Sequence, residues 1–237
     1  MPAPLLLAIE TATRVCSVAL ARGGELIALR SDDDARLHSE RLLPMIDALL
    51  GGARVRLADV EAFSLSIGPG SFTGLRIGLA TVKAFALMDA RPVAAVSTLA
   101  ALCASAAESA ASGGPVAALL DARRGAAYAA CVSRAGLARA DALADCVLTP
   151  PELAARLPRG ARVVVGEGAQ EIAAQLAARR PDLALLALPD LGASAASIAR
   201  LGAQLLAEGA GSDAATLVPT YLRRAEAEAR RTGRAFE

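Results

Sequence analysis

The sequence predicts an α/β protein made of two similar lobes, and three observations lead to this fold class. Apolar runs of strand length alternate with stretches in which apolar residues recur at helical spacing. The order three strands, helix, strand, helix occurs twice, so each lobe is expected to hold a mixed β-sheet in the order βββαβα. The length of 237 residues fits one large domain or two small lobes, since a domain holds ~150 residues.

The first predicted unit begins with a hairpin around a glycine turn. The apolar run at residues 5–9 is continuous, as in a central strand covered on both faces. The next two runs flank Arg22–Gly24, which predicts the turn of a hairpin. A helix is expected from about His38, because apolar residues then recur every three or four positions. The strands of this unit are predicted at 5–9, 15–20, 25–29 and 62–67, and its second helix at 73–88.

The second predicted unit repeats this order with little sequence identity. Its strands are expected at 115–120, 126–132, 143–148 and 163–165, with a short helix opening at Pro150 and a second helix at 169–178. A last helix, 194–206, consists of small residues and leucine, which permit close packing against the first lobe. Such a duplicated unit is typical of the actin-like (ASKHA) fold. We expect a first lobe of residues 1–108 and 192–210, a smaller second lobe of residues 109–191, and a polar, arginine-rich tail at 211–237.

Composition excludes several classes of protein. The longest uncharged stretch, Pro92–Ala107, has 16 residues, fewer than the ~20 that span a bilayer. The first ten residues lack the basic start of a secretory signal, so we expect a cytoplasmic protein without a membrane partner. The 25 basic residues balance 24 acidic ones, which argues against a chain whose main task is to grip nucleic acid. One histidine and four scattered cysteines make a zinc site or a disulfide framework improbable.

Two features of the sequence are candidates for an anion or nucleotide site. The glycine-rich segment from Gly68 to Gly74 joins a buried strand to a helix, whose free amides and dipole can hold an anion. It lacks the Lys-Ser/Thr of a Walker loop, and a tight turn capped by Ser71 or Thr73 explains it equally well.

The second feature is a pair of carboxylates, Glu10 and Asp121, at the ends of matching strands. In a two-lobed cleft these ends face each other and can hold a metal–phosphate, although each carboxylate can instead anchor its own turn. The candidate residues of this vestigial site are Glu10, Thr11, Gly68, Gly70, Ser71, Thr73, Asp121, Gly166 and Gly168. No catalytic Ser/His/Asp arrangement is present, because the single histidine, His38, starts a helix predicted to lie on the surface.

These motifs together resemble the TsaB family, over nearly the whole chain and most strongly over residues 5–125. The motifs that carry the resemblance are Ala8–Thr13 with Cys16–Leu20, His38–Pro44, Gly68–Gly78, Asp121–Arg124 with Tyr128, Gly166–Ala169 and Pro219–Arg223. The resemblance implies an actin-like subunit of the bacterial machinery that makes threonylcarbamoyladenosine at position 37 of tRNAs reading ANN codons. In that machinery the paralogue TsaD transfers the threonylcarbamoyl group, TsaB pairs with TsaD, and the ATPase TsaE joins them.

The same resemblance implies that this chain is not itself the catalyst. The family's usual aspartate at the end of the first strand is Glu10 here, which weakens a metal-binding role. Thr98 and Leu102 stand where TsaD enzymes carry their metal-binding histidines, and leucine has no donor atom. We therefore expect no catalytic residue, no metal and no cofactor, with weak ATP or ADP binding in the complex left open. An active actin-like ATPase or small-molecule kinase is the main alternative, and a metallopeptidase is a weaker one.

A catalytically inactive paralogue is expected to act by binding a partner protein, through a surface on its first lobe. The residues predicted to form it are His38, Leu42, Leu43, Met45, Ile46, Leu50, Arg76 and Lys83, with Leu43 and Leu50 facing outward. Core packing is the alternative for the leucines. A homodimer through the same face is expected when TsaD is absent, and tRNA is expected to contact the chain mainly through the complex.

Overall fold

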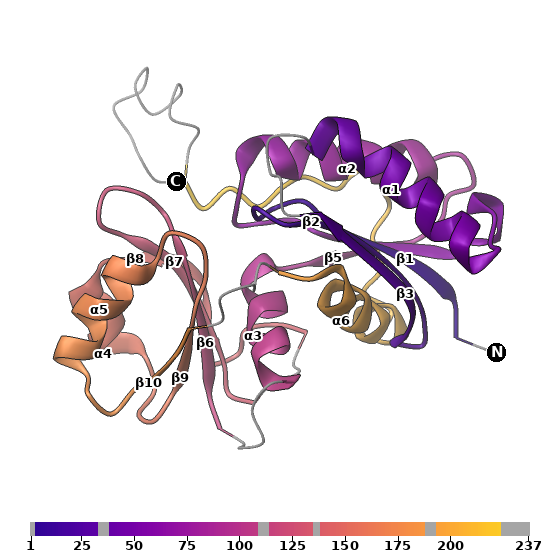
Figure 1. Cartoon of the computed structure of the whole chain (residues 1–237). Helices are drawn as coiled ribbons and strands as arrows, with labels where there is room; N and C mark the ends of the chain where they lie inside the picture. The colour runs from indigo at the N-terminus through magenta and orange to yellow at the C-terminus, as the bar shows by residue number, and fades with distance from the viewer. Residues whose placement is uncertain (1–2, 33–37, 109–113, 135–137, 188–192, 224–237) are drawn as a thin grey trace.

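The computed structural model describes residues 3–32, 38–108, 114–134, 138–187 and 193–223, which form two lobes side by side (Figure 1). Each lobe is built on one five-stranded mixed sheet. The strands of the first sheet are β1 (Leu5–Glu10), β2 (Cys16–Arg22), β3 (Glu25–Asp32), β4 (Ala62–Ser66) and β5 (Val93–Val96). Those of the second are β6 (Val116–Asp121), β7 (Ala127–Val132), β8 (Leu143–Leu148), β9 (Arg162–Val165) and β10 (Ala184–Ala187).

The two sheets have the same connectivity. The first has the order β3-β2-β1-β4-β5 and the second the matching order β8-β7-β6-β9-β10. In each sheet the first three strands of the chain pair antiparallel, and the last two add in parallel on the other side of the first strand. The central strands β1 and β6 therefore occupy equivalent positions in the two sheets, and the turns that follow them both lie at the junction between the lobes.

Helices cover both faces of the first sheet. The helices of the chain are α1 (His38–Ala53), α2 (Phe72–Ala86), α3 (Thr98–Glu108), α4 (Pro150–Arg156), α5 (Gln170–Arg179) and α6 (Ala195–Ala207), with a 3-10 turn at Leu57–Asp59. Helices α1 and α2 lie on one face of the first sheet and α6 lies on the other (Figure 1). In the second lobe α4 and α5 lie together on the face away from the first lobe (Figure 1).

The two lobes share an alanine-rich core at their junction. Helix α3 packs on β6 and β7 of the second sheet and also touches α6. The close fit of α6 on the first sheet depends on small residues, because a Cβ at Gly202 would meet the Ser64 side chain, whose hydroxyl donates to the Ile198 carbonyl at 3.2 Å. Buried Ala, Leu and Val residues from both sheets, α3 and α6 form one cluster, so the lobes are joined by packing as well as by the chain.

The actin-like fold class predicted from the sequence is confirmed, but the repeated unit is longer than predicted. It is βββαβαβα in each half, because β5 with α3 and β10 with α6 complete the two units. The predicted division at residue 108 placed α3 in the first lobe, and in the structure α3 contacts both the second sheet and α6 of the first lobe. Strand β10 and the pair β5–α3 were missed because short, alanine-rich runs show neither a strand nor a helix period.

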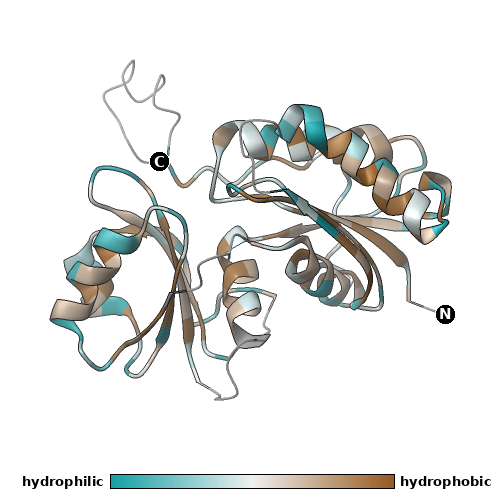
Figure 2. Cartoon of the chain, in the orientation of Figure 1, coloured by the Kyte–Doolittle hydropathy of each residue, from teal (hydrophilic) through white to brown (hydrophobic). Residues whose placement is uncertain are grey.

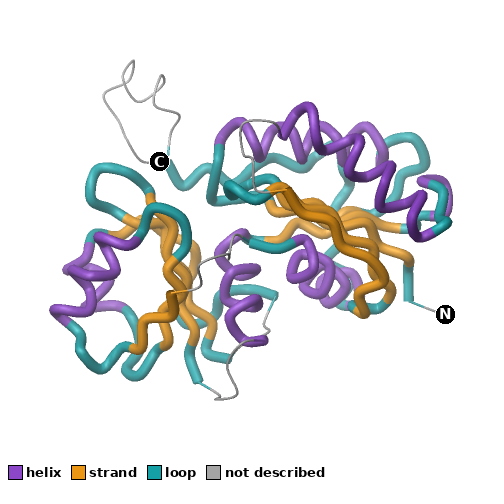
Figure 3. The backbone as a smooth tube through the Cα atoms, in the orientation of Figure 1, coloured by secondary structure: helices purple, strands orange, loops and turns teal. Residues whose placement is uncertain are grey.

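Hydrophobic residues concentrate on the strands and on the helix faces that meet them (Figure 2). The edge strand β3 is the exception, since Leu26, Ile27 and Leu29 are about half exposed along it. After α6 the chain runs as a loop back to the junction between the lobes (Figure 3). None of the described helices has the length and apolar character needed to cross a membrane.

Candidate functional site

A cavity of about 820 Å³ lies between the lobes, at the edge where β1 and β6 end. Five segments line it, and they are far apart in the sequence. They are the turn after β1 (residues 12–14), the loop before α2 (69–72), the turn after β6 (121–124), the start of the loop after β9 (167–168) and the C-terminal residues 220–223. Four of the nine predicted residues of the vestigial anion site line this cleft, namely Gly70, Ser71, Asp121 and Gly168.

Glu10 does not face the cleft. Its side chain is fully buried, and Oε1 accepts hydrogen bonds from the amides of Ala12 at 2.7 Å and Thr13 at 3.0 Å. Burial raises the pKa of Glu10 from 4.5 to about 7, although the neighbouring Ser66 hydroxyl and the two amides oppose the change. Of the two alternatives for this carboxylate, the hydrogen bonds support the one in which it anchors its own turn.

The glycine-rich loop serves close packing between α2 and the end of β1. A Cβ atom at Gly70 would clash with the Ala12 carbonyl, and a Cβ at Gly74 or Gly78 would clash with Thr11. The Thr11 hydroxyl donates to the Gly74 carbonyl at 2.8 Å, and the Ser71 hydroxyl accepts from the Gly74 amide at 3.2 Å as the N-cap of α2. The capping alternative is therefore correct for Ser71, while Thr73, Thr11 and Gly68 lie outside the cleft lining.

The turn after β6 has a strained backbone. Arg123 and Arg124 both have positive φ angles, 66° and 55°, and Gly125 follows at 74°. Residues with a Cβ rarely adopt this left-handed conformation, which costs about 1–2 kcal/mol per residue. The Asp121 carboxylate accepts from the Arg123 amide at 2.7 Å, and the Ala122 amide donates to the Ala126 carbonyl at 3.0 Å. These bonds hold the turn in a shape that places two adjacent arginines in the cleft wall.

Gly166 and Gly168 follow β9 and also serve packing. A Cβ at Gly166 would contact Leu120, and one at Gly168 would lie 2.8 Å from the Asp121 Cβ. The positive φ of Gly168, 73°, is a second reason for glycine at that position. These two glycines therefore let the loop after β9 pack closely against the end of β6. This packing fixes the position of Asp121 in the cleft.

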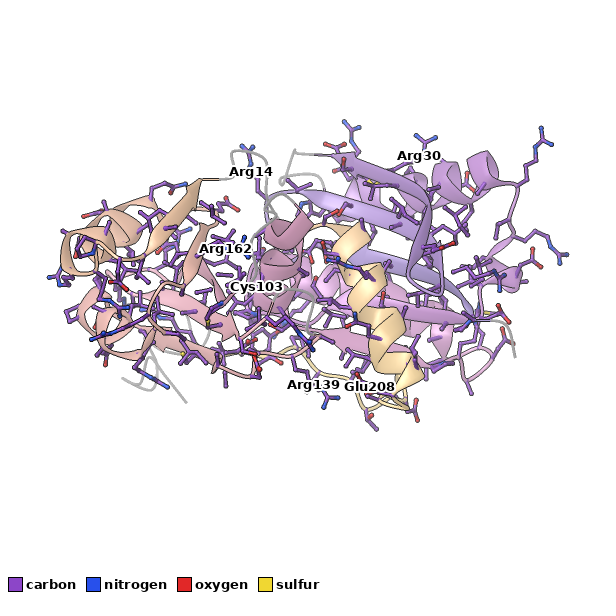
Figure 4. The ribbon with its side chains drawn as sticks, turned by 90° about the horizontal axis from the view of Figure 1, so that it is seen from below. Arg14, Arg30, Cys103, Arg139, Arg162 and Glu208 are labelled. Atoms are coloured by element: carbon purple, nitrogen blue, oxygen red, sulfur yellow. The ribbon has the colours of Figure 1, made fainter. Side chains whose placement is uncertain are left out.

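Arginine dominates the charged lining of the cleft. Its basic residues are Arg14, Arg123, Arg124 and Arg223, and its acidic residues are Asp121 and Glu167. Both acids are engaged, because Asp121 holds its own turn and Glu167 Oε2 accepts from the Arg14 amide at 3.1 Å across the junction. In Figure 4 Arg14 lies between the two lobes. The near-neutral net charge of the chain thus conceals a local excess of positive charge.

His38 differs from its predicted role as a polar residue on a surface helix. It does start α1, but its side chain is buried and lines the cleft, with Nε2 3.1 Å from the Arg14 carbonyl oxygen. Together with Glu167 it holds both backbone groups of Arg14. His38 therefore positions the turn after β1 and is removed from the predicted partner surface.

Sequence reasoning missed the contribution of the C-terminal segment, which it assigned to a polar tail. The Thr220 amide donates to the Ile67 carbonyl at 2.7 Å. The Tyr221 ring lies 5.1 Å from the Phe72 ring, and its hydroxyl accepts from Arg76 Nε at 3.1 Å. Arg223 Nη1 donates to the Arg123 carbonyl at 3.1 Å. The segment thus crosses from the first lobe to the second, and the Pro219–Arg223 motif was the signal available for it.

The predicted partner surface divides into core and exposed residues. Leu42, Ile46 and Leu50 are buried, so the expectation that Leu50 faces outward is wrong. Leu43 is 55% exposed, as expected for an outward position. Met45 is half-buried against the same core. The α2 residues Arg76 and Lys83 border a surface groove of about 500 Å³, which is also lined by Val218, Pro219 and Tyr221.

The described residues contain no group of three or more His, Cys, Asp or Glu side chains that could hold a metal ion. Thr98 and Leu102, which stand at the positions of the TsaD histidines in the resemblance, are fully buried at the junction. What the cleft does present is a set of cationic and aromatic side chains around fixed turns. Such a site can bind an anion, and it offers no arranged nucleophile and base.

The two sheets of matching connectivity, the packing of α3 on the second sheet and of α6 on the first, and the cleft between the lobes define an actin-like (ASKHA) protein. The family model described as "TsaD: tRNA N6-adenosine threonylcarbamoyltransferase" matches residues 32–230. Solved structures from Pseudomonas aeruginosa are similar over the whole fold. One described as YeaZ is 33% identical with a TM-score of 0.77, covering 92% of this chain and all of that one. A second, described as similar to peptidase YEAZ, is 34% identical with the same TM-score, covering 93% of this chain and all of that one.

Curated relatives match part of the chain. The tRNA threonylcarbamoyladenosine biosynthesis protein TsaB of Escherichia coli is 43% identical over 94 residues, which is 40% of each chain. The protein of the same name from Haemophilus influenzae is 40% identical over 97 residues, or 41% of each chain. The chain thus spans about two-fifths of the length of these curated relatives. It belongs to the TsaD-like family and, within it, to the TsaB (YeaZ) members.

Proposed function

We propose that this chain is a non-catalytic partner subunit required for threonylcarbamoylation of N6 of adenosine 37 in tRNAs that read ANN codons. It acts by binding and supporting a catalytic TsaD-like paralogue. The observation that carries the proposal is the state of the two strand-end carboxylates. Glu10 is buried in its own turn, while Asp121 lines the cleft and accepts from the amide of Arg123, so the two do not form a paired carboxylate site for metal–phosphate chemistry.

The helices on the outer face of the first lobe supply the partner surface in this proposal. Helices α1 and α2 contact each other and cover the same face of the sheet (Figure 1). Leu43 on α1, and Leu87 and Met88 at the end of α2, are 55%, 53% and 80% exposed. Exposed apolar side chains on one face are typical of a protein–protein interface. The homodimer proposed in the absence of the paralogue uses the same face.

The other members of the proposed assembly follow from the family. A TsaE-like ATPase joins the pair, and tRNA is held mainly by the complex as a whole. This division of labour is consistent with a chain whose overall charge is only +1 and whose cleft lining has more arginines than acids. The proposal requires no metal or cofactor bound to this chain.

Reconstitution of the modification tests the proposal. TsaD, TsaE and tRNA are assayed with and without this chain, and formation of threonylcarbamoyladenosine is expected only when it is present. Leu43→Asp is expected to abolish capture of TsaD in a pull-down, because a charge at the centre of an apolar interface is left unpaired. The matched control is Leu26→Asp on β3, which changes an equally exposed leucine on a different element.

Three outcomes would contradict this function. Equal capture of TsaD by Leu43→Asp and wild type would remove the assigned surface. ATP turnover by the isolated chain, measured with a calorimetric titration alongside, would instead identify an active ATPase or kinase. Peptide hydrolysis that depends on added metal would indicate a metallopeptidase.

A further inference from the structure

The cleft between the lobes carries two cationic side chains that the fold does not use. The side chains of Arg14 and Arg124 line the cleft and make no hydrogen bond or ion pair with any residue that the structure describes. They come from opposite lobes, Arg14 from the turn after β1 and Arg124 from the turn after β6. Two unpaired guanidinium groups facing one cavity favour an anionic ligand that contacts both lobes.

The backbone of Arg123 and Arg124 is strained, and glycine at these positions would relieve the strain. Arg123 and Arg124 are both left-handed, and the hydrogen bonds of Asp121 and Ala122 hold them there. Strained residues of this kind concentrate at functional sites, where the surrounding structure determines the conformation. The strained turn therefore indicates a function for the side chains of Arg123 and Arg124, both of which line the cleft.

Aromatic rings lie beside these cations on both walls. Tyr128 on β7 lines the second-lobe side. On the first-lobe side the Tyr221 ring lies 5.1 Å from that of Phe72, whose ring has the Arg76 guanidinium 3.9 Å above it. A positively charged groove with aromatic side chains is the usual arrangement for binding single-stranded nucleic acid, where rings stack on bases and arginines contact phosphates. An acidic peptide would use the cations but has no need of the rings.

The lining of the cleft favours a ligand that spans the junction. The unpaired arginines come from opposite lobes and line one cavity of about 820 Å³, so a ligand that contacts both extends from one lobe to the other. Glu10 is buried in its own turn, so the two strand-end carboxylates do not together offer a metal–phosphate site. A segment of several nucleotides satisfies both arginines and places bases near rings on both walls.

We propose that the interlobe cleft, through Arg14 and Arg124 with the rings of Tyr128 and Tyr221, binds a single-stranded segment of RNA. The inference rests on the proposed function, because it assigns to this chain a direct contact with the RNA that the complex modifies. The contact is made mainly to phosphates, so it positions the RNA without selecting its sequence.

The test uses the full chain and a fluorescein-labelled RNA hairpin with a single-stranded loop, followed by fluorescence anisotropy. Loss of one phosphate contact on a single strand weakens binding roughly fivefold at about 0.1 M salt, from the counterions it releases. The double variant Arg14→Gln/Arg124→Gln is therefore expected to bind about 25-fold more weakly. The slope of the logarithm of its binding constant against the logarithm of salt concentration is expected to be smaller in magnitude by about 1.4. Arg30→Gln, which changes an exposed arginine on β3, is the control and is expected to bind as wild type.

Arg124→Gly separates a binding role from a structural one. Glycine accepts the left-handed backbone without a side-chain penalty, so the thermal midpoint is expected to stay the same or rise while RNA binding weakens about fivefold. A structural role for the arginine would lower the thermal midpoint in the same variant. A lowered midpoint, or unchanged RNA binding, would overturn the assignment.

Capture of TsaD is measured on the same preparations. Absence of RNA binding by a wild-type chain that still captures TsaD would overturn this inference and leave the proposed function in place. Equal weakening by Arg30→Gln would show that the binding is a general charge effect, which also overturns it. Complete displacement of the RNA by ATP, or arginine-dependent binding of a polyglutamate peptide in place of RNA, would assign the cleft to another ligand.

Discussion

The buried carboxyl of Glu10 makes the stability of this protein depend on pH, and Glu10→Gln removes that dependence. Burial raises the pKa of Glu10 from 4.5, its value in an unfolded chain, to about 7 in the folded protein. Between these two values the folded state holds a proton that the unfolded state has released. Stability therefore falls as pH rises through this window, and it is constant above the folded pKa.

The size of the effect follows from the two pKa values. Each pKa unit corresponds to about 1.4 kcal/mol, so the full difference is about 3 kcal/mol of unfolding free energy. Glutamine keeps an oxygen that accepts from the Ala12 and Thr13 amides, and its side chain carries no charge at any pH. The variant is therefore expected to gain up to about 3 kcal/mol over wild type above neutral pH and little or nothing near pH 4.5.

Urea unfolding followed by circular dichroism measures this difference at several pH values on both proteins. Glu40→Gln, which changes an exposed glutamate in the first turn of α1, controls for the loss of a surface charge and is expected to follow wild type. Parallel stability curves for Glu10→Gln and wild type across the window would refute the reasoning. A variant less stable than wild type above neutral pH would refute it as well, because it would show that the ionised carboxylate is the stabilising form.

The remaining predictions concern packing and are checked by urea or thermal unfolding. Gly74→Ala is expected to cost about 3 kcal/mol or more, since its Cβ overlaps the Thr11 carbonyl, whereas Gly51→Ala in open space on α1 should gain about 0.5–1 kcal/mol. Leu42→Ala should cost about 2–5 kcal/mol and Leu43→Ala less than about 0.5, and equal effects would contradict their assignment to core and surface. Ser71→Ala should cost about 1 kcal/mol through loss of the α2 N-cap, and no change would mean that the cap is dispensable.

Much of the fold could be predicted because its signals are local. The apolar run of β1, the Gly-Gly turn between β2 and β3, and the helical spacing of α1 each lie within a few consecutive residues. The capping role of Ser71 has the same origin, since the hydroxyl bonds an amide three residues away. The junction helix α3 was missed because a helix that is apolar on all sides, as here in Thr98–Glu108, has no period to detect.

The amino-acid sequence was enough to place most of the strands and helices in order and to locate the glycine-rich turns. The tertiary structure alone decided which lobe α3 packs against, that Glu10 turns away from the cleft, and that His38 is buried. It also brought together arginines from positions 14, 123, 124 and 223, which no spacing in the chain connects. Secondary structure depends on neighbours along the chain, whereas burial and charge clustering depend on how the two sheets and their helices pack together.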